Sequence, residues 1–477
     1  MSTAPLLLWF RKDLRLADNH ALAAAVETGR PVIPVYIREP GHDGSGPLGG
    51  AQAWFLHHSL AALDKALKHA GSRLICRSGK AGDALFALIE ETGADTIHWN
   101  RRYDPAGMQH DSALKTDLKK NGLTVESFAG HLMHEPSKLK TKSGTPYKVY
   151  TPFWRALDAD YDPPEPVSAP DKIKHPHKWP DSETRTDWAL LPTKPDWAAE
   201  FSDLWTPGEG GAHKRLERFL DEGLDRYETG RDFPARDVTS GLSPHLALGE
   251  ISPASIWHAT RNLDHDLRDA VVKFRKELAW RDFCYHLLYH FPKLDRDNWN
   301  DKFDDFPWET NSKAFKAWTK GATGYPIVDA GMRQLWRHGI MHNRVRMIAA
   351  SFLIKDLMID WRRGERWFRD TLVDADPASN AANWQWVAGS GADASPFFRI
   401  FNPVLQGEKF DPDGAYIREF VPELKDLEKR YIHKPFEAPA DVLKKAGVEL
   451  GKHYPKPIVD HKQARDTALG AYKKLSG

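Results

Sequence analysis

The chain has 477 residues, more than one hydrophobic core usually organises, so two or more domains are expected. With 67 Lys and Arg against 66 Asp and Glu, its net charge is +1, so the overall charge indicates no nucleic-acid surface, and any such surface needs local clusters of basic residues. Its two cysteines, Cys76 and Cys284, exclude a four-cysteine metal site, argue against a disulfide framework and indicate a reducing, cytoplasmic compartment.

Short apolar runs alternate with helical patterns over the first third of the chain. These runs lie near Leu6, Val32, Leu74, Ile97 and Val125. The alternation predicts a Rossmann-like α/β domain with a parallel sheet over residues 1–134. We expect Asp18 to cap the first helix, and residues 49–69 to form a longer amphipathic helix. No G-x-G-x-x-G follows the first run, so a dinucleotide fingerprint is unsupported.

Neither a signal peptide nor a membrane span is expected. The first apolar run, LLLWF, is too short for a signal peptide, and charged residues follow it at once. No apolar stretch is long enough to cross a bilayer.

The composition changes twice after the first domain. Residues 135–207 are rich in Pro, Lys and Ser, which predicts a long connector over the surface. Over residues 208–477, apolar residues recur at spacings of three and four, which predicts an all-α domain. The expected fold class is therefore an α/β domain joined by this connector to a helical one.

A first candidate site lies in the segment 227–243. Tyr227, Thr239, Ser240, Leu242 and Ser243 precede a helix that has Pro in its first turn. Hydroxyls and free backbone amides at a helix start can bind phosphate. An ordinary helix cap has the same sequence and, from spacing alone, is the more frequent explanation.

Two helices could recognise a base. Phe274, Glu277, Trp280 and Arg281 share one face of the first, where a carboxylate, an indole and a guanidinium can bond a base edge, stack on it and hold a phosphate. A solvated ion pair is the ordinary alternative. The second helix places Asn343, Arg344, Arg346 and Met347 together, although Met347 by itself is more typical of a core.

Asp374 and Asp376 form a carboxylate pair in DADPASNAANWQW. They could act as acid and base or bind a metal, but no further His or Cys ligands lie nearby, so no metal is expected. A third use is that one carboxylate pairs with Arg346 while the other accepts hydrogen bonds from ribose hydroxyls. Asn380, one turn on, could then bond a polar ring edge.

The chain contains 18 tryptophans. Trp384 and Trp386 follow the carboxylate pair, and Trp361 and Trp308 lie upstream. Indoles can stack on planar ligands or pass electrons, but isolated tryptophans are usually packing residues.

Taken together, these strings resemble the cryptochrome and photolyase family almost end to end. WFRKDLRLADNHAL is similar to the start of the family's antenna domain, and six strings are similar to its flavin domain: SGLSPHLALGEIS, ELAWRDF, TGYPIVDAGMRQL, MHNRVRM, DADPASNAANWQW and FRIFNPVLQGEKFD. The seven strings also occur in the family's order.

The resemblance implies a U-shaped FAD in the helical domain. By motif match, its contacts are Tyr227, Thr239, Ser240, Gly241, Leu242, Ser243, Phe274, Arg281, Arg346, Asp374, Asp376 and Asn380. Asn380 would face the flavin ring nitrogen that is protonated during reduction. Trp384, Trp361 and Trp308 match the family's electron-transfer triad, in that order outward from the flavin.

Within the family, the residues favour an enzyme, a photolyase that splits cyclobutane pyrimidine dimers in DNA by electron transfer from photoexcited reduced FAD. The positions that grip the dimer match Glu277, Trp280, Asn343, Arg344, Met347, Trp386 and Gln406. The alternative is a cryptochrome-type photoreceptor without repair activity, but plant cryptochromes typically carry Asp at the Asn380 position. Photolyases of the 6-4 lesion rank third, because they place His where this chain has Met341 or Asn343.

The antenna domain departs from the family pattern. Where folate-carrying bacterial photolyases have an Asn-Glu pair, this chain has Ala106 and Gly107. The Trp54 helix and TPYKVYTPFWRAL resemble the plant-cryptochrome side, which implies a class III-like branch. We expect methenyltetrahydrofolate held by other contacts, then a deazaflavin or no antenna. A cytoplasmic monomer acting on DNA is expected.

Overall fold

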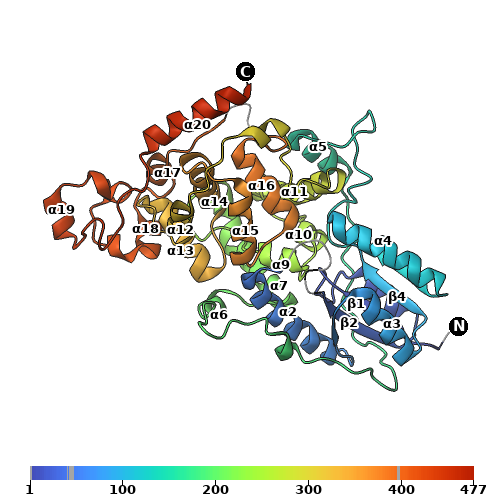
Figure 1. Ribbon diagram of the computed structural model, residues 1–477. Helices are drawn as coiled ribbons and strands as arrows, with labels where there is room; N and C mark the ends of the chain where they lie inside the picture. The colour runs from blue at the N-terminus through green and yellow to red at the C-terminus, as the bar shows by residue number, and fades with distance from the viewer. Residues whose placement is uncertain (1–2, 40, 42–47, 395–397, 477) are drawn as a thin grey trace.

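The computed structural model describes residues 3–39, 41, 48–394 and 398–476 (Figure 1). Five parallel strands form one sheet of order β3-β2-β1-β4-β5. Their bounds are β1 Leu6–Phe10, β2 Val32–Arg38, β3 Ile75–Ser78, β4 Thr96–Asn100 and β5 Thr124–Phe128. The predicted parallel α/β domain is confirmed.

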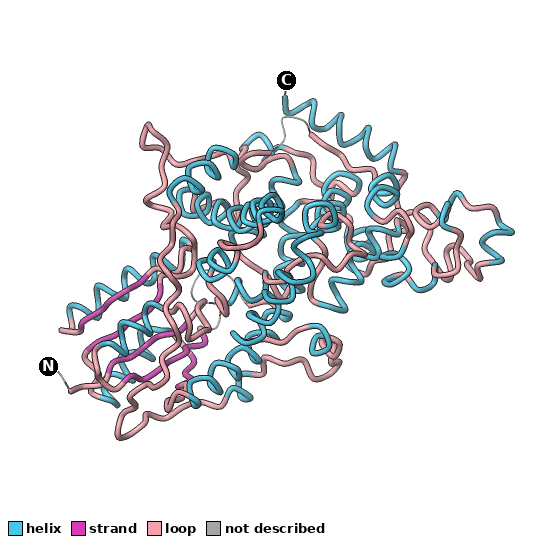
Figure 2. The backbone as a smooth tube through the Cα atoms, turned by 180° about the vertical axis from the view of Figure 1, so that it is seen from behind, coloured by secondary structure: helices cyan, strands magenta, loops and turns pink. Residues whose placement is uncertain are grey.

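The central strand β1 is apolar and buried along its whole length, because helices cover both faces of the sheet. These helices are α1 His20–Glu27, α2 Gly50–His69, α3 Ala81–Thr92 and α4 Pro105–Lys120. Leu6, Leu8 and Phe10 of β1 are buried against α1 and α2, whereas Leu7 and Trp9 are buried against α3 and α4. Figure 2 shows the strands between these helices.

The prediction that Asp18 caps the first helix is wrong. Asn19 is the cap, and its side-chain oxygen accepts a hydrogen bond of 3.1 Å from the amide of Leu22. Asp18 has a φ of 49°, outside the extended region that a cap residue occupies. Its carboxylate instead accepts a hydrogen bond from Ser252, in the helical half of the chain.

The connector contains more structure than the sequence predicts. Within residues 135–207 lie α5 Tyr150–Asp160, the 3-10 helix η1 Arg185–Trp188 and the short α6 Phe201–Leu204. Helix α5 buries Phe153 and Leu157 in the core of the helical domain, and Trp188 is buried beneath α2. A purely superficial connector is therefore the wrong description of these stretches.

The rest of the described chain is helical, as predicted. The longer helices near the site are α7 Glu209–Arg218, α8 Leu224–Gly230, α9 Ser243–Leu248, α10 Pro253–Ala259, α11 Arg268–His290, α12 Ser312–Thr319, α13 Pro326–His338, α14 Asn343–Ser351, α15 Trp361–Thr371, α16 Pro377–Ala388 and α17 Pro403–Phe410. Two π-helices, η2 Phe219–Gly223 and η5 Phe352–Asp356, continue α7 and α14. The 3-10 helices are η3 His265–Leu267, η4 Asp301–Asp305, η6 Pro422–Leu424, η7 Lys429–Tyr431 and η8 Pro435–Glu437, and α18 Ala415–Phe420, α19 Ala440–Lys445 and α20 His461–Ser476 complete the fold.

Helix α2 joins the two domains. The Gly50 amide at its start donates to the Asp370 carboxylate at 2.9 Å, and the Gln52 side chain donates to the carbonyl of Ala375 at 2.7 Å. The carbonyl of Arg369 lies so close to Gly49 that a Cβ there would approach it to 2.0 Å. The α/β domain thus contacts the segment that leads into Asp376.

Within the described ranges, no helix is both long and apolar enough to cross a membrane. The same residues contain no group of three His, Cys, Asp or Glu side chains placed to hold a metal ion.

Candidate functional site

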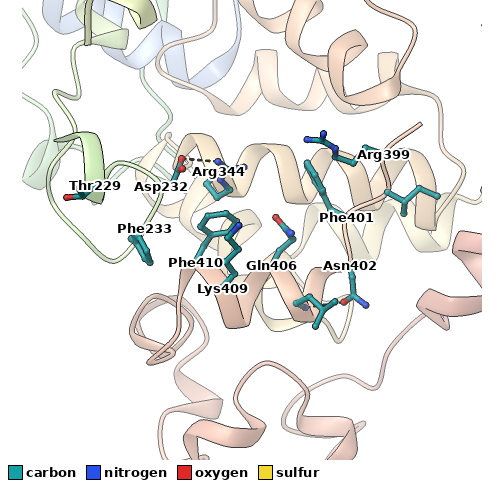
Figure 3. Close-up of a pocket in the computed structure, with 12 residues that line it drawn as sticks. Thr229, Asp232, Phe233, Arg344, Arg399, Phe401, Asn402, Gln406, Lys409 and Phe410 are labelled. Atoms are coloured by element: carbon teal, nitrogen blue, oxygen red, sulfur yellow. Dashed lines mark hydrogen bonds and ion pairs between the residues drawn. The ribbon is translucent and has the colours of Figure 1, made fainter. Parts of the chain in front are cut away.

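A cavity of about 670 Å³ opens between α8, α14 and α17 (Figure 3). Twelve residues line it: Thr229, Asp232, Phe233, Arg344, Arg399, Ile400, Phe401, Asn402, Leu405, Gln406, Lys409 and Phe410. The volume suits a small-molecule or base-sized occupant. Three cations, Arg344, Arg399 and Lys409, favour a ligand with phosphates.

Of the seven residues predicted to grip a lesion, Arg344 and Gln406 line this cavity. Met347 lies next to it, because its sulfur is 3.9 Å from the Arg344 guanidinium. Glu277, Trp280, Asn343 and Trp386 are not part of the cavity lining within the described residues. Asn343 is exposed at the first position of α14, and Trp386 is half-buried against the core.

Two ion pairs join the end of α8 to predicted lesion residues. Arg231 donates to the Glu277 carboxylate, and the carboxylate of Asp232 lies 2.9 Å from the Arg344 guanidinium (Figure 3). The Arg344 guanidinium also lies 4.3 Å from the centre of the Phe410 ring. Arg231 and Asp232 therefore fix two side chains that come from different helices. Neither Arg231 nor Asp232 was predicted from the sequence.

Helix α11 holds Phe274 and Trp280 in aromatic clusters. The buried Phe274 ring lies 4.6 Å from the ring of Phe219 and 5.8 Å from that of Tyr227, by their centres. Trp280 stacks on Tyr150 of α5 with centres 3.7 Å apart and planes 7° apart. One face of the Trp280 indole is thus covered by the connector, which orients the side chain.

The predicted pairing of Arg346 with one of the two carboxylates is confirmed. Its guanidinium contacts both oxygens of Asp374, at 2.9 and 3.1 Å, and also donates to the carbonyl of Met341 at 2.7 Å. Both contacts to Asp374 come from one nitrogen, Nη2, while Nε bonds Met341, so two nitrogens with different partners fix the orientation of the guanidinium. The Asp374 side chain is only 5% exposed, so its charge needs this partner.

Asp376 is the N-cap of α16. One carboxylate oxygen accepts from the Ser379 amide at 2.7 Å, and the other accepts from the Tyr285 hydroxyl at 2.6 Å. Burial raises the pKa of the Tyr285 phenol well above its usual value, so the hydroxyl keeps its proton and donates. A carboxylate has further lone pairs, so it can still accept from a ligand. The D-P-x-S pattern of a cap followed by Pro could have revealed this role.

Arg281 contacts the loop that leaves the sheet rather than the segment 239–243. Its guanidinium donates to the His131 carbonyl at 2.8 Å and lies 2.9 Å from the ring nitrogen of the same residue. Burial, together with the Arg281 charge, lowers the pKa of His131 well below its usual value, so the ring is neutral. His131 could not be predicted as the partner of Arg281, because the spacing of residues on α11 gives no information about a residue in another segment.

The segment 239–243 precedes α9, as predicted, with Pro244 in the first turn of the helix. Thr239 and Ser243 are exposed, whereas Leu242 is buried. Gly241 has a φ of 60°, and a Cβ there would lie 2.4 Å from the Arg215 guanidinium, so both backbone and space require glycine.

Asn380 projects from the first turns of α16 toward α15. Its side-chain amide donates to the Glu365 backbone carbonyl at 3.1 Å and to the Glu365 carboxylate at 2.8 Å. The same carboxylate pairs with Arg369 at 2.8 Å. These bonds use the amide protons and leave the Asn380 carbonyl for another donor.

The three tryptophans of the predicted electron path differ in exposure. Trp384 and Trp361 are 3% and 0% exposed, and Trp308 is half-buried. The Trp361 indole donates to the Asn298 side chain at 2.9 Å. Trp308 packs on Phe306 with ring centres 4.4 Å apart. Trp384 and Trp361 are thus both buried, and Trp308 is the member of the three that reaches solvent.

The polar groups described above suit the chemistry of FAD. Exposed hydroxyls at a helix start suit its pyrophosphate, a buried carboxylate suits ribose hydroxyls, and an amide carbonyl beside an Arg–Asp pair suits a ring that gains charge and a proton. The segment after β4 differs from the folate pattern: Gly107 packs on Arg102, where a Cβ would lie 2.5 Å from the guanidinium.

Two family models match the chain: the FAD binding domain of DNA photolyase over residues 274–474, and DNA photolyase over residues 6–171. The deoxyribodipyrimidine photo-lyase of Agrobacterium fabrum is 68% identical over 473 residues, which cover 99% of this chain and 98% of that protein. Cryptochrome-1 of Arabidopsis thaliana is 37% identical over 478 residues, covering 96% of this chain and 69% of that protein.

A solved structure gives the same result. The crystal structure of a bacterial class III photolyase from Agrobacterium tumefaciens has a TM-score of 0.97 at 67% identity, covering 100% of this chain and 98% of that one. The fold, the motifs and these matches agree over nearly the whole length. The chain belongs to the photolyase and cryptochrome family.

Proposed function

We propose that this chain is an FAD-dependent photolyase that splits cyclobutane pyrimidine dimers in DNA. The observation that carries the proposal is the cation-lined cavity of about 670 Å³, lined by Arg344 and Gln406, in which Arg344 pairs with Asp232, the neighbour in sequence of the Arg231 that pairs with Glu277. The relative at 68% identity, named as a deoxyribodipyrimidine photo-lyase, supports a repair enzyme over a photoreceptor.

The lesion would reach the cavity by leaving the duplex, as base-flipping enzymes require, photolyases among them. Arg344, Arg399 and Lys409 would contact the phosphates on either side. For Arg344, the phosphate would share or replace Asp232. Gln406 and Asn343 would bond polar edges of the bases, with the Trp280 and Trp386 rings stacking beside them, each worth about 1 to 3 kcal/mol.

The Glu277 carboxylate, which accepts from Arg231, would accept a further hydrogen bond from a ring N–H of the dimer. Arg231, fixed behind it, would add a positive charge that is already in place before the electron arrives. The bound FAD would supply, in its reduced and photoexcited form, the electron that opens the cyclobutane ring and would take it back afterwards. The net reaction is a carbon–carbon lyase reaction without redox change.

We propose that the FAD is held by the residues of the family motifs in this chain. Thr239, Ser240 and Ser243, with Gly241 and Leu242, would bind the pyrophosphate, and Asp376 would bind ribose. Tyr227, Phe274 and Arg281 would support the pocket around it. The Arg346–Asp374 pair and Asn380 would face the polar edge of the ring. Trp384, Trp361 and Trp308 would carry electrons to the flavin from solvent.

A second, light-harvesting chromophore is the finer part of the proposal, with methenyltetrahydrofolate as the first candidate. The archaeal photolyase from Sulfolobus tokodaii, a solved relative at 32% identity, contains two FAD molecules, which implies a novel light-harvesting cofactor in that protein. An absorbance spectrum of the purified protein, before and after denaturation, tests this. A near-ultraviolet band beyond those of FAD supports methenyltetrahydrofolate, and flavin bands alone refute this candidate.

Repair itself is tested by giving the reduced protein an oligonucleotide with one thymine dimer and illuminating it with blue light. Recovery of thymine absorbance is expected, and its absence would refute the proposal in favour of a photoreceptor. Glu277→Gln should lower the repair yield per absorbed photon by about tenfold, the loss of a charge-assisted hydrogen bond. Asp269→Asn, an exposed carboxylate on the same helix, is the matched control and should change nothing.

A further inference from the structure

One wall of the lesion cavity comes from a single stretch of chain. Eight of the twelve lining residues lie between Arg399 and Phe410 (Figure 3). Phe398 to Asn402 form an extended segment, and Asn402 then caps α17 by accepting from the amides of Val404 at 3.0 Å and Leu405 at 3.2 Å. The place of Gln406 and Lys409 in the cavity therefore depends on where this segment is anchored.

Two buried side chains anchor it from below. The Lys355 amine, on the π-helix η5, donates to the carbonyl of Arg399 and lies 4.6 Å from the centre of the Phe398 ring. Ser351, at the end of α14, accepts from the amide of Phe401 at 3.3 Å. On the other side, Phe398 stacks on Tyr472 of α20, with ring centres 4.5 Å apart and planes 6° apart.

Lys355 is an unusual residue for a purely structural role. It is 3% exposed, and lysine is rarely buried to that degree unless a carboxylate pairs with it. The neighbouring carboxylate of Asp356 bonds His461 at 2.5 Å instead. An apolar side chain of the same length would fill this space without the cost of burying an amine.

The backbone conformation under Lys355 is also irregular. Residues 352–356 form a π-helix, and such single turns recur at functional sites because they cost stability. Here the turn lies directly below the segment that the cavity uses.

We propose that Lys355 and Ser351 are positioning residues for the lesion: through the Arg399 carbonyl and the Phe401 amide, they hold the segment 398–402, and with it α17, where the cavity fits a flipped dimer. This inference rests on the proposed assignment of the cavity to the dimer. Part of the affinity for damaged DNA would then depend on two side chains that do not line the cavity.

The protonation of Lys355 should be visible in lesion binding. Burial lowers the pKa of its amine to about 7, with Arg399 acting in the same direction and Asp356 in the opposite one. Tyr472 and His461 face the cluster from α20, and His461 is engaged by Asp356. Loss of the Lys355 charge weakens a charge-assisted bond to the Arg399 carbonyl and removes the attraction to the Phe398 ring.

The test compares Lys355→Met and Ser351→Ala with the wild type, all as FAD-loaded protein in the dark. Fluorescence anisotropy measures the Kd for a duplex with one thymine dimer and for the undamaged duplex. We expect the dimer Kd to rise about tenfold for Lys355→Met and about threefold for Ser351→Ala. In each variant the Kd for undamaged DNA should rise by a smaller factor than the dimer Kd, because undamaged DNA loses only the phosphate contacts of Arg399 and Lys409 and no contact inside the cavity. Lys429→Met, an exposed lysine, is the control.

Two further readouts separate positioning from simple structural support. The melting temperature of Lys355→Met should be unchanged or higher, since a buried charge is removed, whereas a structural role predicts a fall. The dimer affinity of the wild type should decrease between about pH 6 and pH 8, and this step should be absent in Lys355→Met.

Wild-type dimer affinity in both variants would overturn the inference while leaving the proposed function intact. Should Lys355→Met lose FAD or melt at a lower temperature, the lysine is structural and its part of the inference is refuted; Ser351→Ala then decides the rest. A wild type that does not distinguish damaged from undamaged DNA refutes the proposed function itself, and this inference with it.

Discussion

Gly364 of α15 allows the closest helix approach near the proposed electron path. A Cβ at this position would lie 2.2 and 2.6 Å from two carbons at the end of the Trp384 indole and 2.6 Å from a methyl group of Leu353. Ordinary carbon contacts begin near 3.4 Å, so Gly364→Ala requires α15 and Trp384 to separate by more than 1 Å. Trp384 has little room to move away, because Phe368 and Trp318 pack against it with ring centres 4.9 and 6.3 Å away.

The expected cost combines two opposing effects. Overpacking of a filled core costs about 3 kcal/mol at the upper end of its range, and alanine in a helix interior gains about 1 kcal/mol over glycine. We therefore expect Gly364→Ala to lower the free energy of unfolding by about 2 kcal/mol, or the melting temperature by about 4 °C. The displaced Trp384 should also slow photoreduction of oxidised flavin.

The assay is thermal unfolding followed by flavin fluorescence, together with photoreduction under blue light and an external electron donor. Gly470→Ala is the matched control, since Gly470 lies within α20 and a Cβ there meets no atom within 4 Å. That control should be neutral or slightly stabilised. A Gly364→Ala protein as stable as this control, with wild-type photoreduction, would refute the packing argument.

Three further outcomes are expected. Trp384→Phe should slow flavin photoreduction at least about tenfold while leaving repair by already reduced protein near the wild-type rate; equal loss of both would exclude Trp384 from the electron path. Arg346→Lys should lower the FAD content of the purified protein, measured as the ratio of flavin to protein absorbance, because a lysine has one nitrogen and lacks the planar group with which Arg346 bonds Asp374 through Nη2 and the Met341 carbonyl through Nε. Full FAD content would count against the assigned role. The stability of the wild type relative to Lys355→Met should rise between pH 7 and pH 10. The Lys355 amine has a pKa of about 7 in the folded protein and an ordinary value of 10.5, so the unfolded chain binds more protons in that window. A difference in melting temperature that stays constant with pH would contradict this expectation.

The sequence predicted the sheet and the helical half because their signals are local. The apolar runs near Leu6 and Val32 are long enough to indicate buried parallel strands, and the three-and-four spacing marks the helices. The error at Asp18 has a local cause too. Asp and Asn are both good cap residues, so the residue types do not distinguish Asp18 from Asn19, and only the backbone conformation does. The connector was predicted wrongly because its prolines indicated a loop. The apolar face of α5 packs against α11, a helix far away in the sequence.

Predictions within the site succeeded where the partners lie in recognisable motifs. The Arg346–Asp374 pair could be inferred because both residues occur in such strings. The contacts of Tyr285 and His131 could not, because both residues lie outside the recognised strings. Tyr150 lies in TPYKVYTPFWRAL, but nothing in that string indicates Trp280 as its partner.

The α8 end shows what such distant partners add to the site. Arg231 and Asp232 are adjacent, yet one pairs with Glu277 of α11 and the other with Arg344 of α14. Because both pairs form within the protein, the side chains that would meet the lesion are already ordered, and less conformational entropy is lost when DNA binds. The two pairs should respond differently to DNA. The Arg231–Glu277 pair should persist when DNA binds. A phosphate at Arg344 would instead compete with Asp232, so Asp232 should oppose the binding of any DNA, whereas Arg231 should contribute only at the lesion.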